Sequence, residues 1–182
     1  MTTYHHGDLP RQLLDSAAEM AASQSPESIS LRELARRAGV SHSAPVHHFG
    51  TRQGLLTALA IQGFEALGAA IENYHDDIYA MGVTYVQWAL AHPGHYAVMW
   101  EPRLLDEDDD SLRSARAAAW TALTAAVARH EDPDSPAEGA GAYAAFALVH
   151  GLAGILLSGA VPAPADSVAL AREVTQRLRF AR

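Results

Sequence analysis

Apolar residues recur at steps of three and four along most of the chain, which is the spacing of amphipathic helices. The first such segment has an N-cap candidate at Asp8 and runs to about Ser23. Its apolar positions are Leu13, Leu14, Ala17, Ala18 and Ala21. Further helices are predicted over residues 30–38, 41–49, 52–74, 78–92, 95–100, 111–130, 139–159 and 165–180. The pattern therefore predicts an all-α fold.

Helix starts and a tight turn coincide in residues 30–56. Ser30, followed three residues later by Glu33, forms a capping box that opens a short helix. Gly39 can adopt the positive φ of a sharp turn, and Ser41 can cap the next helix. This arrangement predicts a helix-turn-helix whose second helix reads DNA.

The second helix of this motif carries short or hydrogen-bonding side chains and almost no apolar stripe, so it has little reason to be buried. Thr51 can cap the following helix, where Arg52 places positive charge and free N–H groups near a DNA phosphate. A corner between two helices of an ordinary helical domain is the alternative interpretation. The predicted DNA-binding residues are Ser30, Ser41, His42, Ser43, Ala44, Pro45, His47, His48, Thr51 and Arg52. Of these, His48 and Arg52 are assigned to phosphates, and His42, Ser43, Ala44 and His47 to base edges.

The segment AGVSHSAPVHHFGTRQGLL resembles the DNA-binding domain of the tetracycline-repressor (TetR) family. YHHGDLPRQLLDSAAEM, just upstream, is similar to the first helix of one large branch of that family. Val46 stands where the family usually has a phosphate-contacting Tyr, and Arg52 where it usually has Lys. The resemblance implies a homodimer that binds a palindromic operator and responds to a small-molecule effector, most often as a repressor.

Two later segments, YVQWALAHPGHYAVMW and FALVHGLAGILLSGA, resemble the ligand-binding half of the same branch. The label of that branch comes from a Trp-x-x-x-His-Gly pattern. This chain has Phe146 in place of the Trp, followed by His150 and Gly151. The resemblance therefore implies an N-terminal three-helix DNA-binding domain that a long helix joins to a helical ligand-binding bundle.

The net charge of −8 is unevenly distributed along the 182 residues. Residues 1–55 hold five Arg and five acids, whereas residues 56–182 hold eight Arg and sixteen acids. We therefore predict a DNA-binding domain over 1–55 and a ligand-binding and dimerisation domain over 56–182. No cysteine is present, which excludes a disulfide framework or thiolate zinc site and suits the reducing cytoplasm.

Aromatic and methionine side chains in the second half could line a pocket for a mostly apolar effector, although the same residues would serve as ordinary core. His150 is the strongest candidate, because an ionisable group on an apolar helix needs a partner, which a ligand or a water could supply. The predicted ligand-binding residues are Tyr85, Trp88, His95, Tyr96, Met99, Trp120, Phe146 and His150.

Residues 139–161 contain no charged side chain apart from His150 if protonated, and the length would satisfy a membrane span. The segment is mostly Ala and Gly and lacks Arg anchors, which favours a helix buried between its own bundle and a partner subunit. A linker at 132–136 precedes it, and the last helix at 165–180 completes a predicted four-helix dimer contact.

Alternatives from other classes rest on weaker patterns. The acidic run at 106–110 lacks the ligand spacing of a calcium loop and is typical of a solvated loop. A metal pair at His92 and His95, or a His-dependent metal hydrolase, lacks a His-Glu-x-x-His motif or a nucleophile elbow. A helical interaction module that has lost DNA binding stays open because of Val46 and the acidic balance. We predict no enzyme activity, no cofactor and no metal.

Overall fold

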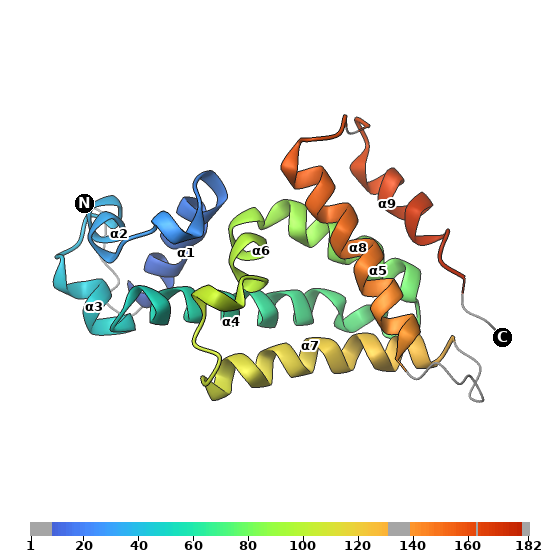
Figure 1. The fold of residues 1–182 in the computed structure, drawn as a ribbon, viewed down its shortest axis with the longest axis horizontal. Coiled ribbons are helices and arrows are strands. Elements are labelled where there is room, and N and C mark those ends of the chain that lie inside the picture. The colour runs from blue at the N-terminus through green and yellow to red at the C-terminus, as the bar shows by residue number, and fades with distance from the viewer. Residues whose placement is uncertain (1–8, 131–138, 163, 180–182) are drawn as a thin grey trace. The chain divides into compact units, whose positions relative to one another are not determined.

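The computed structural model describes residues 9–130, 139–162 and 164–179. Those residues form α-helices and short 3-10 turns and contain no strand, which confirms the all-α prediction (Figure 1). The α-helices are α1 Leu9–Ser23, α2 Leu31–Ala38, α3 Ser43–Phe49, α4 Arg52–Ile71, α5 Ile78–Ala91, α6 Pro93–Met99, α7 Asp110–Ala128, α8 Ala140–Ser158 and α9 Ser167–Thr175. The predicted Asp8 cap and the linker at 132–136 lie outside the described residues.

The helices group into two compact units, and α4 and α7 each contribute one part to either unit. Unit 1 comprises Met1–Phe64 and His92–Ser114, and unit 2 comprises Glu65–Ala91 and Ala115–Arg182. The N-terminal unit thus contains a later segment, with α6, that the division at residue 55 assigns to the second domain. The domain boundary itself stays a prediction.

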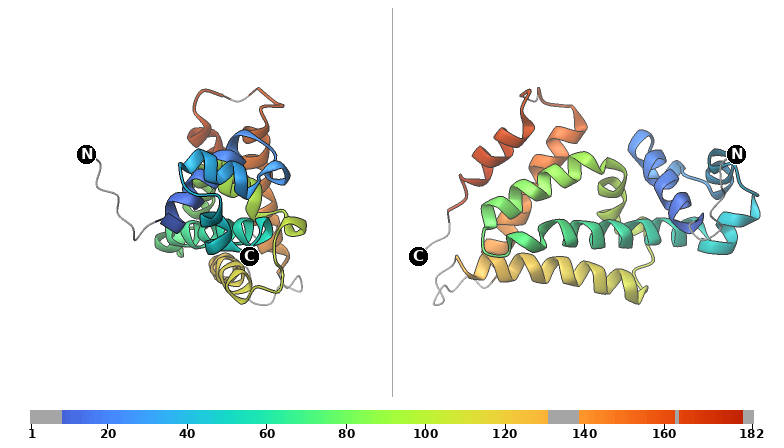
Figure 2. Two further views of the ribbon diagram at one scale, coloured as in Figure 1. Left: turned by 90° about the vertical axis from the view of Figure 1, so that its left-hand side faces the viewer. Right: turned by 180° about the vertical axis from the view of Figure 1, so that it is seen from behind.

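Unit 1 is built around the fully buried side chains of Leu13, Leu34, Leu55 and Leu59, which come from α1, α2 and α4. α2 packs against α1 and α3, and α6 packs along α1 (Figure 2). Burial of each of these leucine side chains stabilises the folded state by about 1.5–3 kcal/mol relative to leaving the side chain exposed. The core therefore fixes the helix-turn-helix from both sides of the turn.

The contact between α1 and α6 is close because Gly94 lies at the crossing. A β-carbon at this position would be 1.9 Å from the carbonyl oxygen of Ala18. Real β-carbons are essentially never closer than 3.0 Å to such an atom, so only glycine permits this approach of the two backbones.

Unit 2 contains α5, α8 and α9, which pack against one another (Figure 1). α9 is shorter than the predicted helix at 165–180, because the carboxylate of Asp166 caps its start and Gln176 ends it. Asp166 Oδ1 accepts from the amides of Val168 and Ala169 at 3.1 and 2.9 Å. This side-chain cap decides where the helix begins.

α8 divides into a buried and an exposed face. Its buried side chains, which lie at helical spacing, are Ala142, Ala145, Val149 and Ala153. The exposed stripe includes Tyr143 and Ile155. α8 and the segment Arg52–Tyr74 have the length and composition of a membrane-crossing helix, a test that core helices of soluble proteins also pass.

Candidate DNA-binding face and effector site

The turn between α2 and α3 is fixed by the predicted cap and glycine. The Ser30 hydroxyl accepts a hydrogen bond from the Glu33 amide at 3.2 Å, and Gly39 has φ +67°. The Glu33 carboxylate does not complete the capping box, since it accepts from Arg36 Nε at 2.9 Å. This bond to Arg36 lowers the pKa of Glu33. The predicted helix start is therefore confirmed through half of the capping box.

The start of α3 differs from the prediction that Ser41 caps it. The helix begins at Ser43, and its N-cap residue is His42, which makes no side-chain capping bond. The carbonyl oxygen of Ser41 accepts from the Ala44 amide at 3.0 Å in a tight turn. The Ser41 hydroxyl instead lies 3.1 Å from that of Ser43. The predicted Ser41 cap is therefore wrong, because α3 begins two residues later, after His42, and the Ser41 hydroxyl faces the Ser43 hydroxyl.

α3 presents a distinct outer face. Ser43, Val46 and His47 are exposed, and their spacing of three and four residues places them on one side of the helix. Pro45 is buried, and Ala44 is half-buried. A buried ring cannot contact a base edge, so the role of Pro45 in unit 1 is to anchor α3 from its inner side.

The start of α4 is formed as predicted. The Thr51 hydroxyl accepts from the Gly54 amide at 3.0 Å, and the Arg52 guanidinium donates to the carbonyl oxygen of Glu27. This bond holds the exposed Arg52 side chain at the loop before α2. The capped helix start keeps cationic charge and N–H groups together, as phosphate binding requires.

Arg32 is a further cation that the sequence-based set did not include. It is exposed in the first turn of α2 and makes no hydrogen bond or ion pair within the described ranges. By contrast, Arg36 pairs with Glu33, and Arg37 Nη2 lies 2.9 Å from the Glu19 carboxylate. The sequence signal for Arg32 was its position two residues after the Ser30 cap, in the first turn of α2.

The acidic loop after α6 is attached to α4 within unit 1. The Asp106 amide donates to the Thr57 hydroxyl at 2.9 Å, and Gln53 Nε2 donates to the Leu105 carbonyl at 2.9 Å. Residues 92–114 add six acids and two Arg to this unit. The comparison of residues 1–55 with residues 56–182 therefore misses that unit 1 itself carries a net negative charge.

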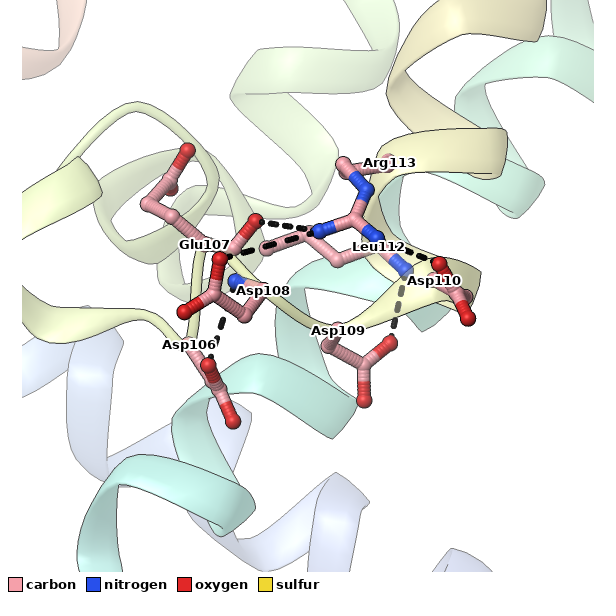
Figure 3. Close-up of polar contacts among 7 residues, drawn as sticks. All are labelled: Asp106, Glu107, Asp108, Asp109, Asp110, Leu112 and Arg113. Carbon is pink, nitrogen blue, oxygen red and sulfur yellow. Dashed lines mark hydrogen bonds and ion pairs between the residues drawn. The ribbon is translucent and has the colours of Figure 1, made fainter.

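Arg113 of α7 neutralises part of this loop (Figure 3). Its guanidinium pairs with Asp110, lies 3.9 Å from the Asp108 carboxylate and donates to the Glu107 carbonyl at 3.1 Å. Asp109 Oδ1 accepts from the amide of Leu112 at 2.9 Å at the start of α7. Within the described parts of the chain, no three His, Asp or Glu side chains are placed to hold a metal ion.

Unit 2 brings four of the predicted effector residues together in an aromatic cluster. Phe146 and His150 of α8 stack with ring centroids 5.0 Å apart and planes 22° apart. The Tyr85 ring of α5 lies edge-on to Phe146 at 6.0 Å, and Trp120 of α7 lies edge-on to it at 6.3 Å. Tyr143, which the sequence-based set missed, packs on Trp120 at 4.9 Å. Its position three residues before Phe146 was the available signal.

The partner that His150 was expected to need lies within the protein, where a ligand or a water had been the predicted candidate. The Tyr85 hydroxyl lies 2.9 Å from His150 Nδ1. Burial lowers the pKa of His150 below its ordinary value, which favours the neutral ring. The cluster is therefore aromatic, and the Tyr85 hydroxyl and the His150 ring are its hydrogen-bonding groups.

Three of the other predicted effector residues belong to unit 1, and the fourth, Trp88, belongs to unit 2. His95, Tyr96 and Met99 belong to α6 in unit 1, where His95 Nε2 lies 3.0 Å from Gln62 Oε1. Burial lowers the pKa of His95 and raises that of Tyr96. Trp88 is buried in α5 of unit 2. A pocket that includes all eight residues stays a prediction.

Family models match both halves of the chain. The model of bacterial regulatory proteins of the tetR family matches residues 13–59, and the model of the tetracyclin repressor-like C-terminal domain matches residues 78–178. The chain belongs to the TetR family. As a member, this TetR-family protein is a DNA-binding transcriptional regulator that acts as a homodimer with a small-molecule effector, and it is not an enzyme.

Solved structures share the fold over nearly the whole chain. A protein of unknown function from Rhodococcus sp. RHA1 is 33% identical, with a TM-score of 0.75 and coverage of 97% of this chain and 98% of its own. A tetR-family regulatory protein from Rhodococcus RHA1 is 19% identical, with a TM-score of 0.75 and coverage of 95% and 98%. The regulator FadR from Bacillus subtilis, solved with stearoyl-CoA, is 12% identical, with a TM-score of 0.72 and coverage of 91% and 95%. None of the curated proteins matches the sequence.

Proposed function

We propose that this TetR-family regulator reads its operator with the exposed face of α3 and is a cytoplasmic repressor. The observation that carries this proposal is the outer face of α3, where Ser43 and His47 are exposed and Pro45 is buried opposite them. Short polar side chains on a protruding helix can reach base edges in the major groove. Arg32 and Arg52 are exposed at the starts of α2 and α4 and supply phosphate contacts.

Dimer contacts are assigned to α8 and α9. The exposed stripe of α8 is apolar and includes Ile155, which is 49% exposed, whereas its opposite face packs within unit 2. An isologous contact between two copies would cover this stripe and form a four-helix arrangement. Sedimentation of the purified protein at micromolar concentration should give a dimer, and a monomer would exclude this contact.

The effector site is assigned to the cluster of Tyr85, Trp120, Phe146 and His150. An aromatic cluster with one hydroxyl and one imidazole suits a mostly apolar molecule that carries a hydrogen-bonding group. Effector binding releases DNA only if the ligand prefers the conformation with low operator affinity, so its differential affinity sets the size of the response.

DNA binding is tested by mobility shift with duplex flanking the gene. Arg52→Ala should weaken binding to all sequences alike and reduce the salt slope of the homodimer by about two, one for each lost phosphate contact. Ser43→Ala should instead change sequence preference, by about 1–3 kcal/mol at the contacted base pair. An Arg52→Ala protein with unchanged affinity and salt slope contradicts the phosphate assignment, and a wild-type protein that shifts no duplex favours an interaction module.

The effector site is tested by a thermal-shift screen that includes long-chain acyl-CoA esters, because the FadR structure of the same fold holds stearoyl-CoA. Compounds that raise the melting temperature of the wild type should fail to do so for His150→Ala and should release operator DNA. Tyr74→Phe, which changes an exposed side chain outside the predicted effector set, is the comparison variant and should keep the response to these compounds. Compounds that stabilise His150→Ala as much as the wild type place the site elsewhere.

A further inference from the structure

Val46 is a large apolar side chain that α3 exposes to solvent. The residue is 50% exposed, and among the described residues of unit 1 no other large hydrophobic side chain is classed as exposed. It lies three residues after Ser43 and next to His47, while Pro45 holds the opposite side of the helix in the core. Val46 therefore belongs to the same outer face as the two residues assigned to base edges.

The chemistry of valine restricts what this side chain can contact on DNA. It carries two methyl groups and no donor or acceptor, so it cannot bind a phosphate oxygen or the polar edge of a base. The major groove offers one apolar feature, the C5-methyl group of thymine. Isolated exposed hydrophobic residues are common on protein surfaces, and the position of Val46 on the reading face is what separates it from them.

We propose that Val46 is a specificity-determining residue that packs its methyl groups against a thymine methyl in each half-site of the operator. This inference rests on the proposed function, in which the outer face of α3 enters the major groove. Apolar contact excludes water from both methyl surfaces, and the loss of one methyl group from such a contact lowers affinity about four-fold. A homodimer makes the contact twice, so symmetric removal should lower affinity about 16-fold.

The test removes single methyl groups from the DNA. The wild-type protein first selects its operator from random duplexes, and each thymine of the selected half-site is then replaced by deoxyuridine, symmetrically in both half-sites. This replacement deletes only the C5-methyl group and keeps base pairing. At one of the thymine positions, this replacement should lower the affinity of the wild type about 16-fold.

Val46→Ala should bind the original operator about as weakly as the wild type binds the substituted one, and its own loss on the substituted duplex should fall below about two-fold. Alanine favours helix more than valine does, so α3 should remain folded in this variant. Tyr74→Ala is the control, because Tyr74 is an exposed side chain of unit 2 outside the dimer contact assigned to α8 and α9. That control should keep the full sensitivity to deoxyuridine.

Two outcomes overturn the proposal while DNA binding stands: a selected operator with no thymine whose methyl matters, or a Val46→Ala protein as sensitive to deoxyuridine as the wild type. A wild-type protein that selects no duplex sequence refutes the proposed function, and the assignment of Val46 with it. The inference is supported if Val46→Ala loses its sensitivity to the deoxyuridine replacement while the wild type and the control variant keep theirs.

Discussion

Replacing Gly94 with alanine should separate α6 from α1. The new β-carbon would lie 1.9 Å from the carbonyl oxygen of Ala18, 2.7 Å from its carbonyl carbon and 3.1 Å from its α-carbon. All three atoms belong to the backbone, so no side-chain rotation can relieve the contact. The two helices must therefore move apart by about 1 Å, which loosens packing along their length.

The expected loss of stability follows from two opposing effects. Overpacking typically costs about 1–3 kcal/mol, and a contact with backbone belongs at the upper end of that range. Alanine also favours a helix over glycine by up to about 1 kcal/mol. We therefore expect Gly94→Ala to lower the free energy of unfolding by about 2 kcal/mol, which lowers the melting temperature by about 4–8 °C in a protein of this size.

The assay is thermal unfolding followed by circular dichroism at one fixed protein concentration, since dimerisation makes the melting temperature depend on concentration. Gly68→Ala in α4 is the matched control, because a β-carbon there would meet nothing within 4 Å. The control should melt at or slightly above the wild-type temperature. A Gly94→Ala protein with the same melting temperature as the wild type would refute the close-approach argument.

Three further predictions concern the caps and the aromatic cluster. Ser30→Ala removes the hydroxyl that accepts from the Glu33 amide and should cost about 1 kcal/mol, measured by urea denaturation; an unchanged midpoint would exclude the cap as a stabilising contact. Tyr85→Phe removes the hydroxyl 2.9 Å from His150 Nδ1 and should cost about 1 kcal/mol in the same assay, whereas Tyr74→Phe on an exposed side chain should not. Burial lowers the pKa of His150, so the unfolded chain takes up the proton first as pH falls below 6.5. The wild type should therefore lose stability relative to His150→Asn as pH falls through about 6.5, and a pH-independent difference would contradict the lowered pKa.

The helix caps and the glycine turn of the N-terminal part could be predicted from the sequence, because each depends on residues that are close together along the chain. A serine three residues before Glu33 and a glycine at the end of the same helix act on their own backbone, and both took the predicted geometry. The Thr51 cap followed for the same reason. At Ser41, by contrast, the backbone turn formed without the predicted side-chain cap, and the sequence alone did not show that the helix begins at Ser43.

Contacts between residues that are far apart in the sequence could not be predicted in this way. The partner of His150 is Tyr85, 65 residues earlier, and only the packing of α5 on α8 brings the two side chains within 2.9 Å. The acidic loop likewise joins unit 1 through Thr57, 49 residues before Asp106. Helical periodicity shows which face of a helix is apolar, but it does not state which other helix covers that face.

The sequence by itself thus determined the helical class and the helix-turn-helix, because periodicity, caps and turns depend on neighbours along the chain. The tertiary structure alone decided that Pro45 is buried while Val46 is exposed, that α6 packs on α1 at Gly94, and that the aromatic residues of unit 2 form one cluster. Those outcomes depend on how the faces of separate helices fit together, and close packing is a property of the whole core rather than of any one segment.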